Sequence, residues 1–557
     1  SIIDLKNKKA NQPYVYKNLA LIFNGEIYNY VELKNILKKN NYDFETTSDT
    51  EVLIKFYDFK GLKAFDYFEG MWSIAIFDLD KSELLLSRDR FGEKPLYFKK
   101  EKNGFYFASE TKFIQSLYNQ KLTPDLDKVN EYLYYGYNSI YKTENSFIKN
   151  IKIFQPSYYF KISHKNSIIK KKYWDLKNVS RFNKKPTKKT ILKNIKNAFI
   201  NSLRIRQRSD VKTASFLSSG IDSNSIWFFT KKFLNKKLET YSLFDKKNKF
   251  YDESRIINKV CKNEKIKNFA LDVSSFNLKK YLKKITKYYN SPTLTLNSLL
   301  ICGLYEKIKS KKIKVTFSGV GSDEIFAGYF DHFRHHILDP DNKNELKKNI
   351  KDFDLIKNYI KNKDFTDLKN KKLNYSRLDN DCSFKKYFKK NPKRINFDTK
   401  KVFSSRLKNA LYYQMEENLY PTLYVEDLNS MMNSVETRSP FLDRKLIEEI
   451  FKTPSKYFIN LGMNKFLLRS IGKNIVPELI LKKRIKQGFN ASLGSIKMIS
   501  KKYLIEILNN KNMKQIFNKK IINYVNKIDI KNLNHEDDKF LFRILSVSFF
   551  LKYHYKK

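Results

Sequence analysis

Cysteine is scarce in this sequence of 557 residues, which contains only Cys261, Cys302 and Cys382. None of them belongs to a CxxC pair, which excludes a disulfide framework and a zinc site and favours a reducing compartment. Long apolar runs are also missing, and even residues 544–551 are too short to span a membrane. No signal-peptide pattern opens the chain. We therefore expect a cytoplasmic protein with no membrane partner.

Acidic residues are few compared with basic ones, 58 against 110, and the formal net charge is +52. Such an excess suggests nucleic-acid binding, but it consists mostly of lysines spread over the whole chain, and RNP, zinc-finger and basic-zipper patterns are absent. We expect no specific nucleic-acid partner, although the charge would attract anionic substrates. The length and the hydrophobic content of 41% indicate a globular protein of two to four domains.

Residues 216–223 combine short side chains with Gly220, between an apolar run expected to be a strand and one expected to be a helix. Such a loop closes around an anion, and the helix behind it points free N–H groups and the positive end of its dipole at that anion. It is not a Walker A loop, because no Gly-Lys-Ser/Thr ending follows. The alternative is an ordinary turn with a Ser or Asp cap. The pattern resembles the PP-loop of ATP pyrophosphatases.

A second apolar strand, within residues 313–329, also runs into a Gly/Ser loop and carries the acid pair Asp323 and Glu324. Two such loops at neighbouring strand ends would clamp a triphosphate, whereas the acid pair alone would suggest a helix N-cap. ATP carries Mg²⁺, which prefers one or two protein carboxylates, and Asp222 and Asp323 are the candidates. Further strands and helices alternate around these loops, including a strand at 239–244 and a helix from Thr190, which predicts a parallel, doubly wound α/β sheet.

Short alternating runs dominate the region before residue 175, which predicts an antiparallel sheet layered with helices. Residues 1–5 are predicted to be a strand, and the polar residues 176–189 an interdomain linker. The further expected strands cover residues 19–23, 72–77, 83–87, 96–98 and 105–108, and the expected helices 30–39 and 50–60.

Four segments of this region, residues 23–29, 48–51, 87–97 and 107–110, resemble the glutaminase domain of glutamine-dependent asparagine synthetases. These are class II amidotransferases with the N-terminal-nucleophile (Ntn) hydrolase fold, an α+β sandwich. The resemblance implies that Asn24 and the Gly25 amide form an oxyanion hole, and that Glu26 and Asp49 hold the amino-acid end of glutamine. A tetrahedral oxyanion needs preorganised donors, which agrees with these roles.

The resemblance departs from the family at its start. The family's nucleophile is an N-terminal cysteine, and no cysteine precedes Cys261 here. Ser1 could act as an N-terminal nucleophile in principle, but the resemblance places it inside a strand. We therefore expect an Ntn-hydrolase-type domain that lacks its first strands, and a glutaminase half that is inactive as the sequence stands.

Segments 427–431, 434–443, 465–469 and 483–489 resemble the synthetase domain of the same family. The resemblance implies that Lys465 lies near the phosphates, where it would stabilise the leaving pyrophosphate, and that Asp427 and Glu436 lie beside the aspartate pocket. Val320 stands where some members carry a glutamate that assists amination, so no base is assigned to that step. The predicted ATP site comprises Leu217, Ser218, Ser219, Gly220, Asp222, Ser223, Leu243, Ser318 and Gly319.

Residues 340–400 match the family least and are expected to form a lysine-rich helical excursion. His332, His335 and His336 could suggest a metal cluster on a helix, but the resemblance gives them no role. The residues after Ser500 are expected to be helical with a basic surface.

Together these patterns predict a glutamine amidotransferase domain at 1–175, a linker at 176–189 and a PP-loop synthetase domain at 190–557. The expected reaction joins ATP and aspartate into β-aspartyl-AMP, which ammonia, normally from glutamine, converts to asparagine. An ammonia-only enzyme or a related adenylating ligase of the β-lactam-synthetase kind is the alternative, and a non-catalytic nucleic-acid binder a third. The expected partners are ATP, Mg²⁺, aspartate and glutamine or ammonia; the assembly is left open between a monomer and a homodimer.

Overall fold

The computed structural model describes residues 2–4, 7–102, 104–118, 123–165, 167–179, 186–246, 252–273, 276–340, 342–359, 374–378, 382–395, 399–484, 493 and 500–554. Ser1, residues 180–185 of the predicted linker, residues 485–489 of the last synthetase motif and parts of the 340–400 excursion lie outside these ranges. Over the described ranges, every helix is too short or too polar to cross a membrane.

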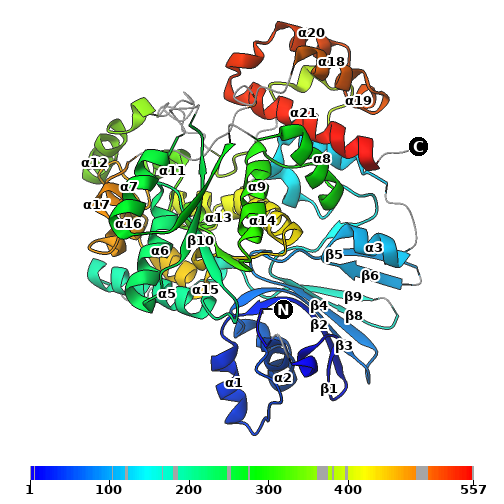
Figure 1. Ribbon diagram of the computed structural model, residues 1–557, viewed down its shortest axis with the longest axis vertical. Coiled ribbons are helices and arrows are strands. Elements are labelled where there is room, and N and C mark those ends of the chain that lie inside the picture. The colour runs from blue at the N-terminus through cyan, green and yellow to red at the C-terminus, as the bar shows by residue number, and fades with distance from the viewer. Residues whose placement is uncertain are drawn as a thin grey trace.

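The first part of the chain is a sandwich of two antiparallel sheets with helices on its outer side. Its larger sheet has the strand order β1-β2-β3-β4-β8-β9, and its smaller sheet the order β6-β5-β7. Helices α1 (Tyr30–Lys38) and α2 (Asp49–Lys60) cover the outer face (Figure 1). The strands are β1 (Tyr14–Tyr16), β2 (Leu19–Ile27), β3 (Gly70–Asp78), β4 (Glu83–Arg88), β5 (Tyr97–Glu101), β6 (Gly104–Ala108), β7 (Lys152–Ile153), β8 (Tyr158–Ile162) and β9 (Ile168–Lys172).

Alternation along β3 shows how this sandwich is held together. Trp72, Ile74 and Ile76 pack toward the helices, whereas Ala75 packs into the core beside the second sheet. Successive side chains of a strand point to opposite faces. Because both faces are covered, nearly the whole strand is buried, and the predicted antiparallel sheet with helices is confirmed.

The predicted strand at residues 1–5 is wrong for its described part, since residues 2–4 form no strand. Asp4 has a φ of +55°, which takes it out of the extended region. Its N–H donates to Asp210 Oδ2 at 2.9 Å, and its carboxylate accepts from the Thr47 N–H. These polar contacts hold the segment against the second domain instead of in a sheet.

The second domain is built on a five-stranded parallel sheet with the order β12-β11-β10-β13-β14. The chain runs outward from β10 in both directions, so the strand order reverses between β10 and β13. Ligands of open α/β sheets bind at such a reversal, outside the carboxyl ends of the strands. The strands are β10 (Thr213–Phe216), β11 (Glu239–Phe244), β12 (Asn268–Asp272), β13 (Val315–Phe317) and β14 (Glu436–Arg438).

Helices cover both faces of this sheet, as a doubly wound fold requires. Ile191, Ile195, Phe199 and Leu203, spaced four residues apart, are all buried along α5, which confirms the predicted helix. One face carries α5 (Lys188–Arg206), α6 (Ile221–Leu234), α15 (Arg444–Lys452) and α16 (Phe466–Gly472), and the other packs on α9 (Leu296–Ser310).

The remaining helices pack around the three sheets. Figure 1 shows α18 to α21 at the top of the view, far from α1 and α2 at the bottom. Helix α21 packs on α8 and on α4 of the first domain, so the last helix ties both parts of the chain together. These helices include α3 (Thr111–Tyr118), α4 (Leu126–Tyr135), α7 (Ser254–Glu264), α8 (Leu278–Tyr289), α10 (Ser322–Ile325), α11 (Phe330–Ile337), α12 (Lys343–Asp354), α13 (Arg406–Gln414), α14 (Tyr420–Met432), α17 (Glu478–Leu481), α18 (Lys501–Asn509), α19 (Lys511–Ile516), α20 (Lys520–Lys527) and α21 (His535–His554).

Candidate active site

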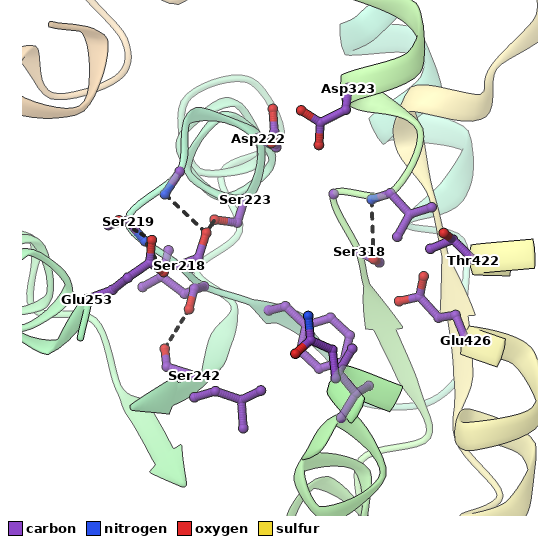
Figure 2. Close-up of a pocket in the computed structure, with 18 of the residues that line it drawn as sticks. Ser218, Ser219, Asp222, Ser223, Ser242, Glu253, Ser318, Asp323, Thr422 and Glu426 are labelled. Carbon is purple, nitrogen blue, oxygen red and sulfur yellow. Dashed lines mark hydrogen bonds between the residues drawn. The ribbon is translucent and has the colours of Figure 1, made fainter. Parts of the chain in front are cut away.

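A cavity of about 530 Å³ opens at the carboxyl ends of β10 and β13, where the strand order reverses. The loops after these two strands form its floor, and α14 forms the wall on the side of β13 (Figure 2). The predicted juxtaposition of two Gly/Ser loops at neighbouring strand ends is therefore confirmed.

The first loop, residues 217–220, is held by its own serines. The Ser218 N–H donates to Ser223 Oγ at 3.0 Å, and the Gly220 N–H donates to Ser218 Oγ at 3.1 Å. Asn224 Nδ2 donates to the Ser218 and Gly220 carbonyl oxygens at 2.9 and 2.7 Å. Gly220 is the N-cap of α6 and has no side chain to cap it. The positive end of the α6 dipole is therefore left to whatever the cavity binds.

Ser219, where related loops commonly have glycine, links the first loop to two charged groups. Its N–H and hydroxyl donate to Glu253 at 3.2 and 2.5 Å, and the Lys483 ammonium donates to the same hydroxyl. Lys483 also lies 3.8 Å from Glu253, and its burial lowers its pKa. Lys483 thus adds a cation near the first loop.

The second loop, residues 318–321, lies very close to the first. A Cβ at Gly319 would lie 3.0 Å from the Asp222 Cβ, so any larger residue would push against Asp222. Gly321 has a φ of +90°, in the region that favours glycine, and begins α10. The Ser318 N–H donates to the Arg438 carbonyl at 3.0 Å, which ties the loop to β14.

Lys465 joins the two predicted metal-binding carboxylates. Its ammonium lies 2.6 Å from both carboxylate oxygens of Asp222 and 2.8 Å from Asp323 Oδ1. Ser322 Oγ also donates to Asp222 at 2.6 Å. Figure 2 shows Asp222 and Asp323 facing each other across the cavity mouth. Two carboxylates converging on one cation are a donor set that also suits Mg²⁺.

Every residue of the predicted ATP and metal sites lines this one cavity. The first loop and α6 contribute Leu217, Ser218, Ser219, Gly220, Asp222 and Ser223; β11 contributes Leu243; the second loop and α10 contribute Ser318, Gly319 and Asp323; and Lys465 precedes α16.

Asp427 and Glu436, expected beside the aspartate pocket, are both engaged elsewhere. Asp427 accepts from the Lys94 ammonium of the first domain at 2.8 Å, and Glu436 accepts from Arg438 Nε at 2.6 Å. The acid that lines the cavity from α14 is Glu426, one residue earlier.

Sequence reasoning missed Glu426, Glu253 and Lys483 as cavity residues. Lys483 belongs to a motif segment that predicts no contact for it, and Glu253 belongs to none of the predicted sites. Glu426 could have been found from its spacing, because it follows Thr422 by four residues and both would share one helix face.

The predicted glutamine site lies at the end of β2 and the start of α2, outside this cavity. Asn24 Nδ2 donates to Ser109 Oγ at 3.0 Å, and a Cβ at Gly25 would overlap the Met71 carbonyl oxygen. Asp49 Oδ2 accepts from the Ile27 N–H at 2.9 Å, and burial raises the pKa of Asp49 to about 6. Burial and the Asp49 charge also raise the pKa of Glu26.

The three histidines of α11 are buried core residues. His332 Nδ1 accepts from the Tyr329 N–H at 3.2 Å, and its Nε2 lies 2.6 Å from Gln414 Oε1. Within the part of the chain that the structure describes, no three His, Cys, Asp or Glu side chains are placed to hold a metal ion.

Two consecutive parts of the sequence match known families. Residues 194–537 match the family described as asparagine synthase, and residues 1–174 the one described as glutamine amidotransferase domain. The glutamine-hydrolyzing asparagine synthetases 1 and 3 of Bacillus subtilis are 28% and 25% identical, over 88% and 86% of this chain and 78% and 77% of their own lengths. The putative glutamine-hydrolyzing asparagine synthetase 2 of Methanocaldococcus jannaschii is 32% identical over 61% of this chain and 67% of its own length.

Proposed function

The chain belongs to the asparagine synthase family, and we propose that its cavity carries out both steps of ATP-dependent asparagine synthesis. In the first step a β-carboxylate oxygen of aspartate attacks the α-phosphorus of ATP, and the bond to the β-phosphate breaks to release pyrophosphate. In the second step ammonia attacks the β-carbonyl carbon, and AMP leaves. The observation that carries this proposal is the gathering of both phosphate loops and Lys465 in one cavity.

The residues of the cavity divide the work of the first step. The N-terminus of α6 and the serines of the first loop would bind the phosphates. Lys465 would release its carboxylates and stabilise the charge that develops on pyrophosphate. Asp222 and Asp323 would hold Mg²⁺, which when bound neutralises phosphate charge. The three cysteines are free thiols, which agrees with a cytoplasmic location.

We assign glutamine binding to residues 1–175 and synthesis to residues 190–557. Asn24 and the Gly25 amide would form the oxyanion hole, while Glu26 and Asp49 would bind the α-ammonium group of glutamine. Two buried carboxyls with raised pKa values provide a place where a cation is strongly favoured. Glutamine binding, measured by calorimetry, should weaken at least about tenfold in Glu26→Gln, and a variant that binds normally would contradict this assignment.

The experiment that tests the proposal measures pyrophosphate release with ATP, Mg²⁺ and aspartate, with ammonium and with glutamine in parallel. Release with ammonium, together with formation of asparagine and AMP, is the expected result. Release that requires another carboxylic acid in place of aspartate would favour the β-lactam-synthetase-like alternative. No release from folded protein with either nitrogen source would contradict asparagine synthesis by this chain.

A further inference from the structure

The α14 wall of the cavity carries a carboxyl that lies outside the cluster of Lys465, Asp222 and Asp323. Thr422 and Glu426 lie four residues apart on α14 and both line the cavity. Figure 2 shows their side chains on the side of Ser318, across the cavity from Ser219 and Glu253. Glu426 therefore stands apart from the first phosphate loop, beside the second.

The Glu426 carboxyl accepts few hydrogen bonds from the described part of the protein. Its Oε1 accepts from the Tyr305 hydroxyl at 3.5 Å, at the long limit for a hydrogen bond. Its Oε2 is buried and has no hydrogen-bond partner among the described side chains and backbone. A buried acceptor without a donor is unfavourable. The arrangement suits a group that receives a proton from a bound molecule.

The surroundings of Glu426 bring the pKa of its carboxyl close to neutral pH. Burial raises its pKa to about 7, while the Ser318 and Tyr305 hydroxyls favour the carboxylate and the neighbouring Asp427 disfavours it. A general base works best when its pKa is close to the operating pH.

The second loop, which lies beside Glu426, cannot supply this chemistry through Val320. Val320 lines the cavity with an apolar side chain that takes up no proton. Its N–H donates to Ser318 Oγ at 3.3 Å, and Ser318 in turn interacts with Glu426. Glu426 thus lies beside the loop that carries Val320.

From this geometry we infer that Glu426 is the general base of the amination step. The inference rests on the proposed function. The lone pair of ammonia forms the C–N bond at the β-carbonyl carbon, and the carbonyl electrons move to oxygen. One proton passes from the nitrogen to the Glu426 carboxylate. The tetrahedral adduct then collapses, the C–O bond to AMP breaks, and AMP leaves with that electron pair.

The test separates the two steps in Glu426→Gln, which keeps the shape and removes the base. Aspartate-dependent exchange of radiolabelled pyrophosphate into ATP reports adenylation, and asparagine formation with saturating ammonium reports amination. We expect exchange within about threefold of wild type and amination lower by about 10²-fold, the usual contribution of a general base. Glu478→Gln is the matched control, because it makes the same change at an exposed glutamate outside the cavity lining, and it should change the amination rate by less than about threefold.

A second variant tests whether a carboxylate at a neighbouring position can replace that of Glu426. Val320→Glu in the Glu426→Gln background places a carboxylate on the neighbouring second loop, and should restore amination by at least about tenfold. Wild-type amination in Glu426→Gln would overturn the inference, as would equal losses of exchange and amination, which would indicate a substrate-binding or structural role. No aspartate-dependent exchange in the wild-type protein would instead overturn the proposed function, and this inference with it.

Discussion

At the scale of single residues, the position of Lys465 is fixed by two carboxylates of the site. It is buried between Asp222 and Asp323, with an ammonium 2.6 to 2.8 Å from both carboxylates. Lys465→Met removes the cation that would face the leaving pyrophosphate. We expect aspartate-dependent pyrophosphate release to fall by at least about 10²-fold.

Lys482→Met is the matched control for this variant, because Lys482 is an exposed lysine that pairs with the equally exposed Glu478. Pyrophosphate release should be unchanged in it. If Lys465→Met kept more than about a third of wild-type activity, a role at the leaving group would be ruled out.

Gly328 supports the same cluster through its size. A Cβ at this position would overlap Asp323 Oδ1 and the Lys465 Cε. Gly328→Ala should therefore displace both groups and lower pyrophosphate release by at least about tenfold, since a small misplacement of catalytic groups is expensive. Gly104→Ala, whose Cβ would meet only a tyrosine ring edge at 3.3 Å, is the control. Equal activity in the two variants would refute the steric argument.

Predictability at this scale depends on whether a residue belongs to a local pattern. Ser218, Asp222 and Asp323 follow strand ends within recognisable loops, so the sequence indicates their place directly. Glu426 lies on a helix in which Asp427 is its neighbour, and only the direction of each side chain decides which acid faces the cavity. In the structure Asp427 pairs with Lys94, which is more than 300 positions away in the sequence, and Glu426 lines the cavity.

At the scale of elements, the buried histidines of helix α11 make the stability of the fold depend on pH. Residues 331–337 are all buried, and burial lowers the pKa of His335 to about 3 and that of His336 to about 4. Unfolded histidines bind protons below about pH 6.5, whereas these do not until pH 4 or lower. The unfolded state therefore binds more protons between pH 6.5 and 4, and stability falls as the pH is lowered through this window.

The expected slope is about 1.4 kcal/mol per pH unit for each histidine. His336→Phe, which keeps the volume and cannot titrate, should reduce the slope of the unfolding free energy between pH 6 and 4.5 by about that amount. Urea unfolding at several pH values measures it. His164→Gln, at an exposed turn, should leave the slope unchanged; an unchanged slope in His336→Phe as well would show that α11 is not the source.

Elements were predictable where one periodicity dominates. The i, i+4 spacing from Ile191 to Leu203 predicts α5, and the alternation around Trp72 predicts β3. The same reasoning failed at residues 2–4, where an apolar beginning suggested a strand but Asp4 bonds to Asp210 in the second domain. A contact with a distant residue overrode the local preference.

At the scale of the whole molecule, the two domains meet through buried charges as well as apolar cores. Arg206 of α5 pairs with Glu69 of the first domain at 3.0 Å, and Arg438 of β14 lies 3.9 Å from Glu26. The alternation of strands and helices predicts each sheet, but no pattern in the sequence pairs these residues. The proposed glutamine site and the second phosphate loop both contact β14, since the Arg438 carbonyl accepts from Ser318.

The buried pair of Lys94 and Asp427 provides the test of this interface. Its atoms lie 2.8 Å apart, with side chains that are 2% and 9% exposed. Lys94→Met leaves Asp427 buried without its cation, which should lower the unfolding free energy by about 3 kcal/mol. Lys94→Met with Asp427→Leu replaces the pair by apolar groups and should recover most of that loss.

Urea unfolding of the single and double variants measures the coupling between the two positions. We expect one cooperative transition in the wild-type protein, because ion pairs and α21 join the two domains. Lys482→Met, on an exposed pair, should leave the midpoint unchanged. If Lys94→Met and the double variant lost equal stability, the pair would not couple the domains, and two separate transitions would show that the interface does not unite them.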